Sequence, residues 1–267
     1  MFELDKTQYH LVAHLTGGKI HYPEPESVIR GHSPGRVFVD RVSGPRAAFI
    51  YVRGQGGFYL LGDAEQSGFV AEVERLVDTY FAPYLQAQGI SGFEFSADDP
   101  AWHPAIRAAF SGRELQSDSQ HVYLLDRPRW KEVAARAQAV PIDAALLNGP
   151  LGNDQFLARK LQDCWLTYDE FSAHGLGSCV VCDGRVVSLC FSGYAADQRH
   201  AIVVETLPES RRRGFAKLAA AALLEQYHAQ DIIAHWDVMP GNLGSIALAE
   251  SLGFAWAYTY CVYYFSL

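Results

Sequence analysis

A strand, a basic turn and an alanine-rich helix follow one another in the last third of the chain, and this segment constrains the fold most. The apolar residues 201–204 predict a strand, and residues 208–210 predict the turn that ends it. Residues 215–228 have the composition of a helix of high propensity. The arginines at 211–213 therefore stand directly before the N-terminus of the predicted helix.

Positive charge at this position is unfavourable for stability alone, because the helix dipole already places partial positive charge there. The backbone N–H groups of the first helical turn also have no partner inside the helix. A bound anion would resolve this conflict. Gly214 would let the backbone come close to a bulky phosphate, and Ala216 is small enough not to block it. The sequence therefore predicts an anion-binding turn.

The pattern Arg211-x-x-Gly214-x-Ala216 resembles the pyrophosphate loop of the Gcn5-related N-acetyltransferase (GNAT) superfamily. Residues 242–245 and 248–254 resemble a later helix of that superfamily, which ends in a Leu-Gly-Phe turn. The resemblance implies that acetyl-CoA is the cofactor. The residues that it places at the coenzyme are Val204, Thr206 and Leu207 on the strand, Arg211, Arg212, Arg213, Gly214, Phe215 and Ala216 in the loop, and Asn242 and Ser245 on the later helix.

Within the second half of the chain, the resemblance points to one subgroup of the superfamily. Residues 169–171, 187–192 and 204–206 look like the subgroup that contains the zwittermicin A resistance acetyltransferase. That subgroup also carries a divergent N-terminal half before its catalytic domain.

Both halves of the chain repeat one order of predicted elements: hairpin, strand, long helix, strand, short helix and strand. The long helix of the first half is predicted over residues 64–88, and the hairpin of the second half is predicted to turn at Asp183 and Gly184. We therefore predict an α+β fold with a mixed α/β sheet, built as a tandem of two GNAT-like folds. Residues 1–127 form the degenerate N-terminal domain, and residues 128–267 form the catalytic domain.

The turn of the first half lacks the features that favour an anion. Glu65 stands where Arg211 stands in the second half, and its carboxylate would repel a pyrophosphate. Val70 adds bulk where Ala216 is small. We expect that the first half does not bind coenzyme A and has a structural role.

Acetyl transfer to an amine needs the amine in its neutral form, so a base is useful near neutral pH. Glu205 ends an apolar strand beside the predicted coenzyme loop, where burial would make its carboxylate a stronger base. Glu205 could instead accept hydrogen bonds from a loop or pair with an arginine. Asp237, at the end of the next strand, is the second candidate base. Many relatives have a tyrosine general acid where Ala249 stands, which leaves the general acid unassigned.

Composition limits the partners. The formal net charge of -8 argues against general nucleic-acid binding, which favours a basic surface. No apolar run approaches the roughly 20 residues that cross a bilayer, and the N-terminus lacks a signal pattern, so we predict a cytoplasmic protein without a membrane partner. The spacing of the cysteines suggests no zinc site, and no metal is expected. Monomer and homodimer both stay open.

Together these features predict an acetyl-CoA-dependent N-acetyltransferase that acts on the primary amine of a small molecule, with antibiotics and other aminated metabolites as candidate acceptors. The amine would attack the thioester directly, with Glu205 as general base. The alternative is a coenzyme A-binding regulatory or sensor module without turnover, which Ala249 permits.

Overall fold

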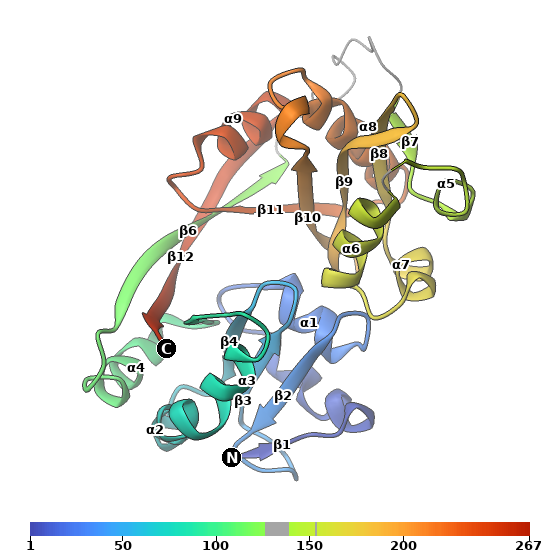
Figure 1. The fold of residues 1–267 in the computed structure, drawn as a ribbon. Helices are drawn as coiled ribbons and strands as arrows, with labels where there is room; N and C mark the ends of the chain where they lie inside the picture. The colour runs from blue at the N-terminus through green and yellow to red at the C-terminus, as the bar shows by residue number, and fades with distance from the viewer. Residues whose placement is uncertain (126–138, 153) are drawn as a thin grey trace. The chain divides into compact units, whose positions relative to one another are not determined.

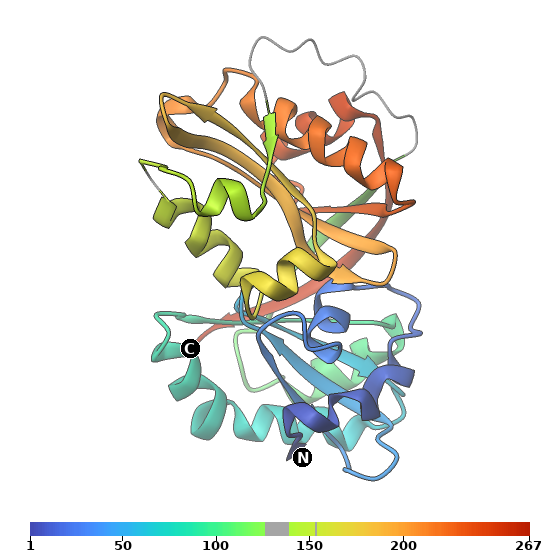
Figure 2. The ribbon, with the colours of Figure 1, turned by 90° about the vertical axis from the view of Figure 1, so that its right-hand side faces the viewer.

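The chain forms two compact units in the computed structural model, which describes residues 1–125, 139–152 and 154–267 (Figures 1 and 2). Unit 1 contains Met1–Gln120 and Tyr260–Leu267, and unit 2 contains His121–Thr259. The predicted domain boundary between residues 127 and 128 lies outside the described residues. Within the described part of the chain, no helix is long and apolar enough to cross a membrane.

Unit 1 is a mixed sheet with helices. Its strands β2 to β4 are antiparallel neighbours in sequence order, and β5 runs parallel to β4. The strands are β1 (Phe2–Glu3), β2 (Gly35–Val39), β3 (Ala47–Val52), β4 (Gly57–Gly62) and β5 (Gly92–Ala97). The helices are η1 (Lys6–Leu15), α1 (Pro23–Ile29), α2 (Ser67–Leu76), η2 (Val77–Phe81), α3 (Ala82–Gln86), η3 (Pro100–Trp102) and α4 (His103–Ala109).

The core of unit 1 is aromatic and centres on β3. Every residue of β3 is buried, because the strand lies between β2 and β4 and is covered on both faces. Phe49 stacks on Phe58 of β4 with ring centroids 4.6 Å apart, and Phe93 of β5 stacks on Phe58 at 5.0 Å. These contacts join the antiparallel and parallel parts of the sheet.

The helix predicted over residues 64–88 is interrupted. The segment η2 is a turn of π-helix between α2 and α3, in which the N–H of Ala82 donates to the carbonyl of Val77, five residues earlier. Pro83 follows directly. Proline has no N–H and its ring clashes with the carbonyl four residues before it, so the helix widens by one residue at this point.

Unit 2 repeats the mixed arrangement. Strands β7 to β10 are antiparallel neighbours in sequence order, and β11 runs parallel to β10. The strands are β7 (Ala139–Pro141), β8 (Gly177–Cys182), β9 (Arg185–Ala196), β10 (Arg199–Thr206) and β11 (Ile233–Val238). The helices are α5 (Ala144–Leu147), α6 (Asp154–Cys164), α7 (Tyr168–His174), η5 (Pro208–Ser210), α8 (Phe215–Ala229) and α9 (Leu243–Leu252).

Two local predictions for unit 2, the strand over residues 201–204 and the helix over residues 215–228, are confirmed to within two residues at each end. Helix α8 begins at the predicted Phe215, and the β8–β9 hairpin turns at Asp183 and Gly184. Both turn residues have positive φ, 50° and 71°, as a two-residue hairpin turn of type I′ requires.

The sheet of unit 2 separates two groups of helices. Figure 2 shows α6 and α7 on one face and α8 on the other. Val204 packs against the apolar cluster that includes α8, whereas the next residue, Glu205, forms an ion pair with Lys160 of α6. The β-bulge of β10 lies earlier, between Ala201 and Ile202, so the strand alternates regularly through its last residues.

The last part of β10 extends beyond its parallel neighbour. All residues of β10 and β11 are described by the structure. The two strands are paired only from Arg199 to Ala201 on β10 and from Ile233 to His235 on β11. Residues 202–206 of β10 are therefore paired on the β9 side alone. Beyond Ala201, β10 and β11 are no longer paired, which leaves a gap between the carboxyl ends of these two parallel strands. Ligands bind at such a position in many α/β sheets.

Two long strands contribute to both units. Strand β6 (Gln116–Leu125) ends in unit 2, where it pairs antiparallel with β11, and β12 (Phe254–Ser266) ends in unit 1, where it pairs antiparallel with β5. The final strand of each half thus completes the sheet that the other half begins.

Candidate active site

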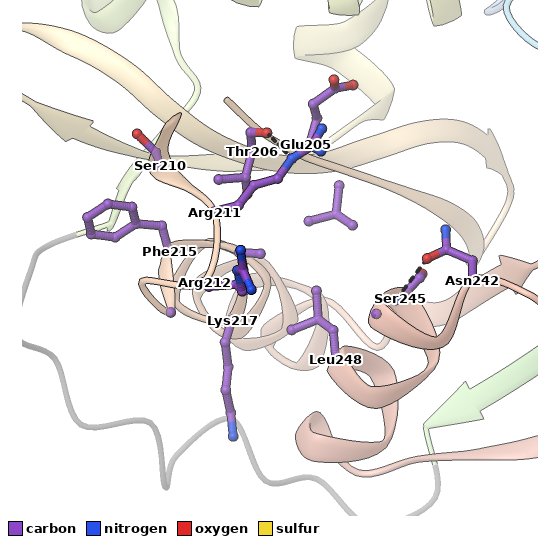
Figure 3. Close-up of a pocket in the computed structure, with 14 residues that line it drawn as sticks. Glu205, Thr206, Ser210, Arg211, Arg212, Phe215, Lys217, Asn242, Ser245 and Leu248 are labelled. Carbon is purple, nitrogen blue, oxygen red and sulfur yellow. Dashed lines mark hydrogen bonds between the residues drawn. The ribbon is translucent and has the colours of Figure 1, made fainter. Parts of the chain in front are cut away.

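A pocket of about 590 Å³ lies at the carboxyl end of β10, between the N-termini of α8 and α9 (Figure 3). Its volume falls within the roughly 300–1,000 Å³ of small-molecule sites. The residues that line it are Val204, Glu205, Thr206, Ser210, Arg211, Arg212, Gly214, Phe215, Ala216, Lys217, Asn242, Gly244, Ser245 and Leu248. The predicted strand, loop and later helix thus meet at one cavity.

Gly214 caps α8 in the left-handed conformation, with φ of 82° and ψ of 0°. No side chain of the described residues caps the helix, so within this part of the chain the N–H groups of its first turn have no side-chain partner at the cap. An added Cβ on Gly214 would have no heavy atom of the described residues within 4 Å. Gly214 is therefore needed for its backbone conformation, and the space beside it is open to a ligand.

The loop before α8 has an unusual backbone. Arg212 has a positive φ of 59°, Gly214 has one of 82°, and Arg213 between them does not. Such alternation turns successive N–H groups toward one side and favours anions. A positive φ is uncommon for a residue other than glycine and often marks a functional site.

The three arginines of the loop point in different directions. Arg211 donates from Nε to the carbonyl of Thr206 at 3.3 Å and lines the pocket, as does Arg212 (Figure 3). The guanidinium of Arg213 instead lies 4.7 Å from the ring centroid of Phe215 and does not line the pocket. Among the described residues that line the pocket, the cationic ones are thus Arg211, Arg212 and Lys217.

The N-terminus of α9 forms the opposite wall. Asn242 caps the helix by accepting a hydrogen bond from the N–H of Ser245 at 3.2 Å. The Ser245 hydroxyl accepts from Trp236 Nε1 at 3.0 Å, so its own proton can be donated into the pocket. Both residues line the cavity, as the sequence predicts for coenzyme-binding residues.

The end of β10 forms the floor of the pocket. Val204 and Thr206 line it, and the Thr206 hydroxyl lies 2.7 Å from the hydroxyl of Ser188. Leu207 does not line it, and its N–H already donates to the carbonyl of Val187 at 3.0 Å. The backbone groups that could hold an extended ligand are therefore those of residues 204–206.

Glu205 is the single acid among the 14 described residues that line the pocket. Its carboxylate lies 2.7 Å from the ammonium group of Lys160, and its side chain is 36% exposed. In Figure 3 it points away from α8, on the far side of β10. The sequence suggested a buried carboxylate or an arginine partner, whereas the observed partner is a lysine and the site is half-open to solvent.

Asp237 lies apart from this pocket. It is partly buried on β11, pairs in register with Val122 of β6, and does not contribute to the lining. Asp237 thus does not share the cavity with Glu205.

Comparison with known proteins agrees with this geometry. A family model described as GNAT acetyltransferase matches residues 19–263. The chain belongs to this family. It is also 23% identical to the uncharacterized N-acetyltransferase YdfB of Bacillus subtilis (strain 168), over 98% of this chain and 97% of that protein.

Solved structures support the fold of this acetyltransferase. A GCN5-related N-acetyltransferase-like protein from Streptococcus suis 89/1591 superimposes with a TM-score of 0.64 and 22% identity, over 96% of this chain and 98% of that one. A tandem GNAT protein from the clavulanic acid biosynthesis pathway superimposes with a TM-score of 0.60 and 14% identity, over 98% and 95%. The predicted mixed α/β fold, matching a tandem GNAT structure, is confirmed.

Four lining residues of the acetyltransferase were missed by the sequence interpretation: Ser210, Lys217, Gly244 and Leu248. Lys217 could have been found, because it is the third residue of α8 and belongs to the same first turn as Phe215. Ala249, on α9, is fully buried in the core and carries no group that could donate a proton.

Proposed function

We propose that this acetyltransferase transfers an acetyl group from acetyl-CoA to the primary amine of a small molecule, and that residues 128–267 carry the reaction. The observation that carries the proposal is the position of Glu205. It is a carboxylate at the edge of a pocket whose other charged lining residues, among those that the structure describes, are the cations Arg211, Arg212 and Lys217 beside the N-terminus of α8. The cationic part suits the coenzyme, and the acid suits an amine.

The coenzyme phosphates fit the N-terminal end of α8. The open space beside Gly214, the exposed first-turn N–H groups and two arginines provide charge-assisted hydrogen bonds to a diphosphate. The backbone of residues 204–206 is paired with β9 alone, so its other edge can bond an extended arm. Coenzyme bound here would supply an acetyl thioester at the end of that arm.

Glu205 prepares the acceptor amine in this proposal. A free alkylamine is protonated at neutral pH, with a pKa of about 10. The Glu205 carboxylate accepts one proton from the ammonium group, which leaves a nitrogen lone pair to attack the acetyl carbon. As the new C–N bond forms, the C–S bond breaks and its electron pair leaves with sulfur. The nitrogen then loses its second proton, which neutralises the thiolate directly or through water, and Glu205 returns its own proton to solvent. Glu205 can reach the acceptor side because its carboxylate points away from α8 (Figure 3).

Carboxylates inside unit 1 support the proposal that the first half is degenerate. Asp63 accepts the N–H of Glu65 at 2.9 Å, and Arg46 is its ion-pair partner. Asp98 accepts the N–H of Gly62, the last residue of β4, at 3.0 Å. These acids already occupy backbone donors of the kind that would hold coenzyme, and they would repel its phosphates.

The acceptor belongs to a class that we infer from the sequence resemblance. We propose that the chain is functionally related to the zwittermicin A resistance subgroup, which makes an aminated antibiotic or related metabolite the acceptor. The alternative, a coenzyme-binding module without turnover, would have the same pocket. Such a module would bind acetyl-CoA and release no free thiol when an amine is added.

The test combines coenzyme binding with thiol release. The purified protein is titrated with acetyl-CoA by calorimetry and then incubated with acetyl-CoA and a panel of primary amines, with free thiol as the readout. We expect binding and amine-dependent thiol release. Binding without release for every amine would favour the non-catalytic module, and absence of binding would refute the proposal.

A further inference from the structure

The acidic group proposed as the base does not stand alone. The Glu205 carboxylate and the Lys160 ammonium are 2.7 Å apart, and their side chains are 36% and 31% exposed. Both therefore remain accessible to a ligand. The pair joins α6 to β10. Figure 2 shows α6 on the face of the unit 2 sheet opposite α8.

This ion pair is a poor receptor for a simple amine. An ammonium ion that approaches Glu205 meets the positive charge of Lys160 at nearly the same distance, so the attraction and the repulsion largely cancel. Binding would also separate Lys160 from its carboxylate and leave the lysine without its counter-ion. A half-exposed ion pair is weak, however, and can open for a ligand that replaces both halves of it.

We propose that the acceptor is a zwitterion, an amine that carries a carboxylate or phosphate close to the reacting nitrogen. Its amine contacts Glu205 and its anion contacts Lys160, so one internal ion pair is exchanged for two with the ligand. The proposal rests on the proposed function, because it names the substrate class of the same site. Lys160 is then a residue that determines specificity.

The length and flexibility of the lysine side chain make the exchange feasible. Lys160 reaches Glu205 from the middle of α6, where the helix backbone is fixed by the buried side chains of Leu157 and Leu161. The ammonium group can swing on its four-carbon stem without movement of the helix. The amine stays next to Glu205, as proton transfer requires.

The experiment compares matched acceptors. Each amino acid of a panel is tested beside the amine formed by its decarboxylation, and each aminoalkyl phosphate beside its aminoalcohol. The members of a pair share the reacting amine and differ in the anion, and the two series distinguish a carboxylate from a phosphate. We expect kcat/KM to be about tenfold or more higher for the zwitterionic member in at least one series, the size of one charge-assisted hydrogen bond.

Variants of α6 separate recognition from folding. Lys160→Met should raise KM for the zwitterions with little change in kcat, and should not raise KM for the simple amines. Lys160→Arg should retain the preference. Arg159→Met, which removes an exposed neighbouring charge of the same helix, should leave the preference unchanged. A purely structural role of Lys160 would weaken both members of each pair equally.

The outcomes distinguish this proposal from the function on which it rests. Acetylation of simple amines at the same or greater efficiency would overturn the zwitterion proposal and leave the acetyltransferase intact. If acetyl-CoA binds but no panel member is acetylated, calorimetry of each pair on the coenzyme-loaded protein decides, and equal or absent binding overturns the proposal. If acetyl-CoA does not bind at all, the proposed function fails and this inference fails with it.

Discussion

Replacement of Gly214 by valine tests the coenzyme site most directly. The residue has φ of 82° and ψ of 0°, and an added Cβ would meet no heavy atom within 4 Å in the part of the chain that the structure describes. The protein should therefore fold, with a penalty of about 1–2 kcal/mol for a side chain in the left-handed conformation. The added atoms would point into open space beside the first turn of α8, where a diphosphate is expected.

The loss of affinity follows from the contacts that the side chain would block. A hydrogen bond to a charged group contributes about 1.5–3 kcal/mol, and each 1.4 kcal/mol is a factor of ten in the dissociation constant. Loss of one N–H contact to the diphosphate should therefore weaken acetyl-CoA binding by about tenfold to a hundredfold. Calorimetric titration of the folded variant measures this change.

Gly184 offers a matched control for backbone strain. It lies in the β8–β9 turn with φ of 71°, and an added Cβ there also meets no heavy atom within 4 Å among the described residues. Gly184→Val should lower the melting temperature about as much as Gly214→Val, and it should bind acetyl-CoA like the wild type. Equal affinities for Gly214→Val and the wild type would refute the assignment of α8 as the diphosphate site.

Three further predictions concern the two halves and the base. Titration should give one acetyl-CoA site per chain, and a stoichiometry near two would show that Asp63 and Asp98 do not exclude the coenzyme. Glu205→Gln should bind acetyl-CoA normally, lose roughly 10²- to 10⁴-fold in kcat and recover partly at high pH, whereas unchanged kcat and KM would remove the residue from the mechanism. Burial raises the pKa of Asp98 to about 6 from an ordinary 3.8, so protonation stabilises the folded state, fully below about pH 4, and this stabilisation is lost as the pH rises through about 6. The free energy of unfolding relative to Asp98→Asn should therefore increase on going from pH 7.5 to pH 4.5, and a pH-independent difference would contradict this.

The features that sequence predicted well are local. Helix α8 has alanines throughout and a glycine before it, and the β8–β9 turn has an aspartate followed by a glycine, so each is determined by neighbours in the chain. The break in the long helix of unit 1 has a local cause too, in Pro83, although the prediction did not use it.

Features that depend on distant partners were not predicted. The apolar pattern of β12 is compatible with any sheet, so the pattern could not show that the end of this strand pairs with β5. The contact between Lys160 and Glu205 depends on how α6 packs on β9, which no spacing in the sequence encodes. The direction of each arginine in the loop depends on the positive φ of Arg212, which is rare for arginine.

The repeated fold supplies the geometry of a ligand site twice, since β4 with β5 and β10 with β11 are both parallel pairs that feed a helix. What differs is the chemistry at the carboxyl end of each pair. In unit 1 the Asp98 carboxylate accepts the N–H of Gly62, so a buried acid occupies the donor and brings negative charge with it. In unit 2 the corresponding end is lined by Val204 and Thr206 and faces two arginines across the pocket. Removal of Asp98 alone would not create a second coenzyme site, because Asp63 still occupies the N–H of the following turn. The proposed absence of coenzyme binding in the first half therefore requires no change of fold, and Asp63 and Asp98 accept the backbone N–H groups of these loops.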